Sequence, residues 1–198
     1  MSASGRKAGC CLNLLCKPVS NLFGKQLECI TMTEKETDAV ALLETQHREM
    51  ERLLALVRGA ETAEARKALF TKAADLLTVH IKSEEEVFYP AVHRARTEDD
   101  LLEALEEHLS LKRLLKDLLE LDPGDKTFEA KFKVLKEQTE HHHREEEEHL
   151  FPAVRRLLDA DERAALGSEM LTTQIDMTQQ GAPRGTVKNE TATAARLD

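Results

Sequence analysis

Apolar residues recur at intervals of three and four along four long stretches of this chain, which is the spacing of one face of an α-helix. The stretches begin near residues 37, 63, 97 and 127 and predict four long helices. Gly59 and the turn sequence at residues 122–125 predict tight connections between neighbouring helices. The pattern therefore favours an all-α fold, an antiparallel up-down-up-down four-helix bundle. An extended coiled coil is the alternative, and the short connections argue against it.

The two ends of the chain differ from this periodic body. Residues 1–35 are basic, lack periodicity and contain all four cysteines. Three interpretations of them stay open: a disordered extension or mis-assigned start, a transit-type peptide, or a lipid-anchored tail. The bundle is expected over residues 36–158. Residues 159–198 are expected to form a short helix followed by a disordered polar tail.

Composition and charge narrow the classes of function. Hydrophobic residues make up 41% of the chain, charged residues 33% and aromatic residues only 4%, which fits solvated helices better than a β-sandwich. The net charge is −9 although residues 1–31 carry four basic residues against one acidic residue, so the body is strongly acidic. This disfavours nucleic acid as a partner and suits cations. The absence of long apolar runs predicts no transmembrane helix, and the cysteine-free body favours a cytoplasmic location.

A motif in the second predicted helix recurs in the fourth. The sequence from His80 to Val92 aligns with that from His142 to Val154, with a His, three consecutive Glu residues and Pro-Ala-Val in common. The first and third helices match more faintly, with His47 aligned to His108. A helix pair has thus been used twice, and the two copies are expected to pack about an approximate two-fold axis. Equivalent residues would then converge near that axis.

The residues that converge are typical metal ligands. Each copy supplies one His from its first helix and a His-x-x-x-Glu from its second, and positions four apart lie on one helix face. All are in phase with the apolar stripes, where charged groups without partners would be costly. Imidazole and carboxylate together suit iron, manganese or zinc. The sequence therefore predicts a metal site formed by His47, His80, Glu84, His108, His142 and Glu146.

Neighbouring residues are expected to have other roles. Only the middle residue of the His141–His143 run is in step with the stripe, so the other two, with His93 and His149, are expected to be ordinary structural or surface histidines. The adjoining glutamates, at positions 85, 86, 147 and 148, are expected to face solvent or to support the ligands. Tyr89 is expected to lie off the inner face, which disfavours oxygenase chemistry.

Over residues 36–157 these motifs resemble the hemerythrin-like (HHE cation-binding) domain family. The resemblance implies two iron ions with an oxo or hydroxo bridge, bridging carboxylates from Glu84 and Glu146, and histidines as terminal ligands. Oxygen carriers of the family have an additional His one turn from the third-helix His, and here those positions are Ala104 and Lys112. They also end with His-x-x-x-x-Asp, where this chain has His142 and Glu146 four apart. We therefore expect less saturated iron ligation than in the carriers.

Three functions follow from such a centre. The first is binding or sensing of a diatomic ligand, oxygen or nitric oxide, or of iron. The second is a di-iron redox enzyme that consumes peroxide or nitric oxide, or that delivers iron for iron–sulfur repair. The third is metal storage or a structural metal. The dry, Leu-rich lining favours the first, and the sequence indicates no particular protein partner.

Overall fold

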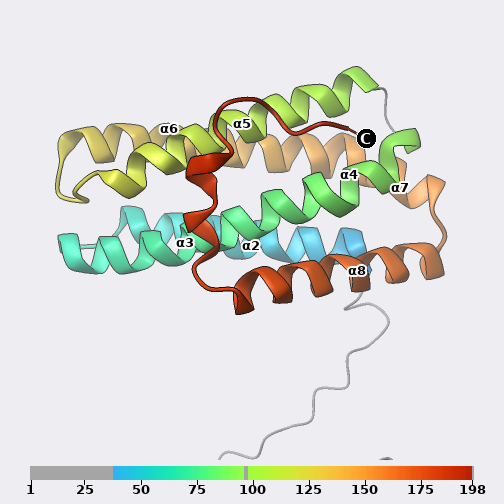
Figure 1. The fold of residues 1–198 in the computed structure, drawn as a ribbon, viewed down its shortest axis with the longest axis horizontal. Coiled ribbons are helices and arrows are strands. Elements are labelled where there is room, and N and C mark those ends of the chain that lie inside the picture. Colours follow the sequence, from blue (N-terminus) through green and yellow to red (C-terminus); the bar gives the residue numbers. More distant parts are fainter. Residues whose placement is uncertain (1–37, 96–97, 198) are drawn as a thin grey trace, which may run out of the picture. The chain divides into compact units, whose positions relative to one another are not determined.

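The computed structural model describes residues 38–95 and 98–197. The predicted extension over residues 1–35, and Thr97 at the predicted start of the third helix, lie outside these ranges. All secondary-structure elements of the described residues are helices, and these residues include no strand. The long helices are α2 (Ala39–Arg58), α3 (Ala63–Ser83), α5 (Glu98–Glu120), α6 (Lys126–Glu145) and α8 (Ala160–Gln179) (Figure 1). Among the described helices, none combines the length and the apolar character needed to span a membrane.

Short polar side chains cap the starts of three of these helices. The Asp38 carboxylate accepts hydrogen bonds from the backbone N–H groups of Val40 and Ala41, at 3.0 and 3.1 Å. The Thr62 hydroxyl accepts one at the start of α3, and Asp159 forms a reciprocal capping box with Glu162 at the start of α8. These caps satisfy backbone donors that a helix leaves free in its first turn, so the sequence itself marks where the helices begin.

The main helices pack as two hairpins. Helices α2 and α3 lie together along their length, and so do α5 and α6 (Figure 1). The turn before α6 has the Asp122 carboxylate accepting from the Gly124 N–H at 2.7 Å, as the Asp-Pro-Gly sequence predicts. The prediction of an all-α helical bundle is confirmed. The up-down-up-down order stays a prediction.

The core consists of two apolar clusters separated by a polar layer. The first cluster lies at the end of the bundle near the hairpin turns and includes Met50, Leu77 and Leu135. The second, at the opposite end, includes Leu43 and Leu105 among its members. Helices α2 and α5 pass from one cluster to the other near His47 and His108, and the chain does so beyond the ends of α3 and α6, after His80 and His142. The polar side chains between the clusters are therefore enclosed by hydrocarbon above and below.

Helices α3 and α6 each continue through one turn of π-helix. These turns are η1 (Glu84–Phe88) and η3 (Glu146–Leu150), followed by α4 (Tyr89–Val92) and α7 (Phe151–Leu157). Pro90 and Pro152 are the second residues of α4 and α7. The sequence predicts that Pro90 kinks or ends the second helix and that Pro152 ends the fourth, but the chain stays helical beyond both. The wider turn just before each proline accommodates a ring that cannot donate a helical hydrogen bond.

The C-terminal part of the chain packs onto the bundle. Helix α8 lies against α2 and α3, with Leu166 and Met170 buried in the second apolar cluster. The last segment then crosses α3 towards α5 (Figure 1), through the short 3₁₀ turns η4 (Pro183–Gly185) and η5 (Val187–Asn189). Val187 is buried in the first cluster. The sequence predicts a disordered tail here; in the structure buried Pro183 and Val187, and the ion pairs of Arg184 with Asp75 and of Glu190 with Lys82, hold this segment against the bundle.

We expect Val187→Ala to destabilise the protein by about 2 kcal/mol, because it removes two buried methyl groups and leaves a cavity. The measurement is urea unfolding followed by circular dichroism. Val134→Ala is the matched control, since Val134 is 42% exposed, and it should change stability by less than about 0.5 kcal/mol. Equal effects of the two substitutions would contradict the packing of the tail.

Candidate metal centre

All six predicted site residues lie together in the polar layer. The four histidines come from four helices and are at most 1% exposed, and Glu84 and Glu146 are equally enclosed. Glu84 Oε2 lies 3.3 Å from His80 Nε2 and 3.4 Å from His108 Nε2. Glu146 Oε2 lies 3.3 Å from His47 Nε2 and 3.8 Å from His142 Nε2. Each carboxylate therefore stands between one imidazole of its own hairpin and one of the other hairpin.

The outward nitrogen of each of these imidazoles is held by an oxygen acceptor. Because carboxylate and amide oxygens accept, the ring Nδ1–H donates, and Nε2 of each ring faces the centre, where Nε2 of His108 and Nε2 of His142 lie 2.9 Å apart. Such contacts fix both the tautomer and the ring orientation of metal-binding histidines. The Nδ1 pairs are His47 with Glu147 at 2.8 Å, His80 with Gln46 at 3.1 Å, His108 with Glu85 at 3.2 Å and His142 with Glu107 at 2.7 Å.

These outer contacts follow the sequence repeat. The residue before His47 holds His80, and the residue before His108 holds His142. In the same way, the residues after Glu84 and Glu146 reach across to the other hairpin. Of the four adjoining glutamates, which were expected to face solvent or to support the ligands, Glu85 and Glu147 contact histidine rings and Glu86 and Glu148 are exposed. The approximate two-fold relation predicted from the repeat accounts for this pairing.

Tyr89 belongs to the centre, contrary to the sequence expectation. It is fully buried, and its hydroxyl donates to Glu146 Oε1 at 3.0 Å and lies 3.4 Å from Nε2 of both His108 and His142. The expectation assumed α-helical geometry, in which a residue five positions after Glu84 points elsewhere. In the π-turn the Tyr89 N–H bonds to the Glu84 carbonyl, so residues five apart come onto one face.

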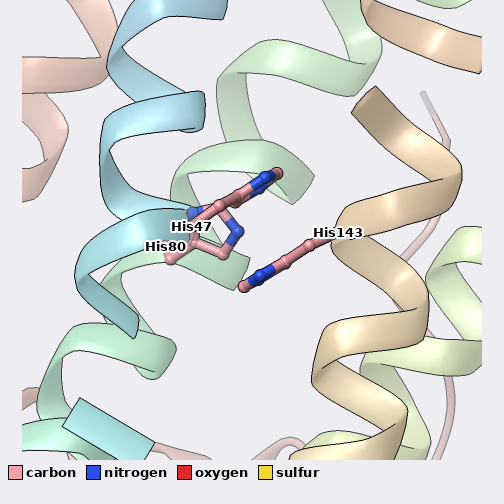
Figure 2. A group of neighbouring side chains, drawn as sticks. All are labelled: His47, His80 and His143. Carbon is pink, nitrogen blue, oxygen red and sulfur yellow. The ribbon is translucent and has the colours of Figure 1, made fainter. Parts of the chain in front are cut away.

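His143 is buried beside the predicted ligands, although the sequence analysis took only His142 as in step with the apolar stripe. It is 2% exposed and stacks on His47 with ring centroids 3.8 Å apart. Figure 2 shows its ring reaching from α6 towards His47 and His80. A signal was available: Thr139 is buried on the same stripe, and both the third and the fourth residue after it lie on that face. By contrast, His93, His141 and His149 are exposed, as expected.

Burial and mutual charge set the protonation of the cluster. Burial, together with the charge of Glu146, raises the pKa of Glu84 well above the ordinary carboxyl value. Burial also raises the pKa of Glu146, but the surrounding imidazoles, first His142, outweigh it and hold that pKa low. Burial lowers the pKa of the His80 and His143 imidazoles well below the usual value, and the nearby His47 adds to this. Imidazoles of lowered pKa stay neutral and keep a lone pair for a cation.

The donor atoms form groups of the size that binds a metal ion. In each of three groups, one donor atom per residue lies within 4.8 Å of every other. The first group consists of His47, His80 and His143. The second consists of His47, His80, Glu84 and Glu146, and the third of Glu84, His108 and His142.

Fold and site together define a helical-bundle protein with a buried histidine–carboxylate cluster suited to cations. The family model described as the hemerythrin HHE cation binding domain matches residues 38–154, which is more than half of the chain. The chain therefore belongs to the hemerythrin HHE cation-binding domain family, as the sequence motifs predicted.

A solved structure and a curated protein are similar to this chain. The structure is that of a hemerythrin HHE cation binding domain-containing protein from Mycobacterium kansasii, 25% identical, with a TM-score of 0.63, covering 80% of this chain and 94% of that one. The curated protein is a DNA nickase from Nostoc sp., 28% identical over 104 residues. That match covers 52% of this chain and only 30% of the nickase.

Proposed function

We propose that this protein holds two iron ions and binds or senses a small diatomic ligand, oxygen or nitric oxide, or iron itself. In this proposal His47, His80, His108 and His142 are terminal ligands, and the carboxylates of Glu84 and Glu146 bridge the two ions. The observation that carries the proposal is the position of each carboxylate between imidazoles of two different hairpins. In each glutamate one oxygen, Oε2, faces both imidazoles, so each carboxylate can share a cation with donors of both hairpins.

The unpaired donors of the cluster fit such a pair. Buried polar atoms are normally hydrogen-bonded, so those without a partner need a reason. Within the described part of the chain, these atoms gather in this one layer and are all potential metal donors. They are Nε2 of His47 and His80, both oxygens of Glu84, Oε2 of Glu146 and both ring nitrogens of His143. Cations bound beside the two buried carboxylates would also balance carboxylate charge that the apolar surroundings disfavour.

The chain supplies a defined environment around the proposed ions. Iron, when bound, supplies a redox-active centre able to bind diatomic molecules. The two apolar clusters exclude water on both sides of the polar layer. The Tyr89 hydroxyl, whose pKa is raised by burial and by the charges of Glu146 and Glu84, keeps its proton and can donate a hydrogen bond within the centre. His143 offers a further imidazole beside His47 and His80, which supports fuller ligation than the sequence suggested.

A redox enzyme is the second candidate, and Tyr89 favours it. The sequence argument against oxygen-activating chemistry assumed that no redox-active aromatic residue lies near the site. A buried phenol 3.0 Å from a proposed ligand removes that argument. The nickase activity named for the Nostoc relative is not part of the proposal, because the matched region covers 30% of that protein and this acidic chain is a poor partner for nucleic acid.

The test of the proposal is metal content together with an absorption spectrum. We expect about two iron ions per chain after purification in air from iron-rich medium, with near-ultraviolet bands of an oxo-bridged diferric pair. Oxygen or nitric oxide is then added to the dithionite-reduced protein. Spectral changes reversed by removing the gas support binding, and lasting oxidation supports the enzyme. Zinc alone, or no metal, would overturn the di-iron proposal.

A further inference from the structure

One cavity leads from the surface to the histidine–carboxylate cluster. It has a volume of about 220 Å³ and lies between α5 and α6, with His142 and Glu146 among its lining residues. Leu101, Ala104 and Leu150 provide apolar walls. A larger cavity of about 700 Å³ between α3 and α8 is mostly apolar and reaches Gln46, but it is lined by none of the six proposed ligands. The smaller cavity thus gives the more direct approach to the centre.

The approach is strongly acidic. Glu103, Glu107 and Glu145 line the cavity together with Glu146, and no Lys or Arg is among its lining residues. The neighbouring surface hollow is lined by Glu106 as well as by Glu103 and Glu107, so the negative charge extends outward along α5. The nearby Arg144 is exposed and donates to His141 at the rim without lining the cavity. A narrow passage lined by one sign of charge concentrates ions of the opposite sign.

One residue that lines the cavity, Glu146, has a buried carboxylate oxygen without a hydrogen bond. Glu146 is 2% exposed, and its Oε2 is among the buried atoms without a hydrogen bond in the described part of the chain. This is an independent observation from the acidic rim. A cation that loses part of its water shell at the rim would meet an unpaired carboxylate oxygen at the end of the passage. The small side chain of Ala104 leaves room for it.

We propose that this cavity is the route by which divalent cations enter the cluster, with Glu103 and Glu145 attracting the cation and Glu146 receiving it. The inference rests on the proposed function, since it takes a cation as the occupant of the cluster. Glu107 also lines the route but holds His142, so it is not a clean site for a test. Glu103 and Glu145 are not among the residues described above that hold the histidine rings, and replacing their charge should leave the centre itself intact.

The test measures how fast the metal-free full-length protein takes up Co²⁺, followed by the visible absorption of the bound ion in a stopped-flow instrument. At low ionic strength we expect Glu103→Gln/Glu145→Gln to slow uptake about tenfold, with an unchanged final number of ions per chain. The control is Glu120→Gln/Glu129→Gln, which removes the same charge from exposed positions of the same two helices. Ala104→Leu should slow uptake by narrowing the passage and should leave its salt dependence unchanged.

The possible outcomes separate the two proposals. If the wild-type protein takes up no Co²⁺, the proposed function fails. If it takes up Co²⁺ and both the acidic double variant and Ala104→Leu load at the wild-type rate, only the route is overturned. Equal slowing by the control double variant would likewise overturn it, because net charge alone would then explain the effect. Slower uptake in the cavity variants alone supports the route.

Discussion

Glu84→Gln is expected to have opposite effects on the metal-free and the metal-loaded protein. Without metal, the buried carboxyl has a raised pKa, so the fold favours its protonated form. Its contribution to stability is therefore fully present at low pH and is lost as the pH rises through the raised folded-state pKa. Glutamine imitates the protonated form. At neutral pH the metal-free variant should be more stable than wild type by about 1–3 kcal/mol. When metal is added, the variant should bind no metal, because it lacks one of the two proposed bridging carboxylates.

Urea unfolding of chelator-treated protein between about pH 5 and 8 measures the first effect, and metal content after reconstitution measures the second. The buried His80 and His143 have lowered pKa values, which oppose the pH trend of Glu84 in both proteins alike. The difference between the two proteins thus isolates Glu84. Glu86→Gln is the control, because Glu86 is 53% exposed. A variant that gains no stability and still loads two ions would refute the assignment.

His80→Ala and Glu146→Ala are each expected to abolish metal loading, whereas His141→Ala and His93→Ala should load like wild type. The first two residues are buried donors in the cluster, and the last two are exposed. Metals per chain are measured after reconstitution, and folding is checked by circular dichroism. His141 lies next to the proposed ligand His142. If any substitution in this helical turn disturbed the fold and lowered metal loading, His141→Ala would therefore lower it too. Equal loading of all four variants would show that the metal, if any, binds elsewhere.

His143→Ala extends this comparison to the imidazole that the sequence analysis set aside. We expect two ions at saturating metal, with one of them lost to a competing chelator about 10–100 times more readily than from wild type. The exposed neighbour His141→Ala should show no such loss. If His143→Ala retains both ions as tightly as wild type, His143 is a packing residue stacked on His47.

The sequence predicted the helices and the six clustered residues because both depend on a simple period. Apolar spacing fixes which face of a helix is buried, and a histidine in phase with that face must be buried too. The repeat then placed His80 and His142, and likewise Glu84 and Glu146, at equivalent positions. The ends of the helices were harder to predict from the sequence. Pro90 and Pro152 looked like terminators because a regular α-helix does not tolerate them in its interior.

The position of Tyr89 and the burial of His143 were both missed for one reason, the assumption that each residue turns the helix by the same angle. A π-turn adds one residue without ending the helix. It therefore brings Tyr89 onto the same helix face as Glu84, whereas a regular α-helix would put the two residues on different faces. His143 was excluded by taking one direction as inward. The core, however, accepts a range of directions wide enough for His142 and His143 together. Only the packing of the other helices decides how wide that range is.

The two π-turns also bear on whether the insertion of the extra residue preceded the duplication of the helix pair. A π-turn is one extra residue in a helix, and here the two lie at equivalent places, η1 after His80 and η3 after His142. If both hairpins descend from one ancestral helix pair, that insertion occurred before the duplication. Tyr89 aligns with Phe151, and Ile81 aligns with His143, so these differences arose afterwards. The ancestral pair would have assembled as a symmetric dimer with two identical half-sites, and duplication within one chain allowed the halves to diverge.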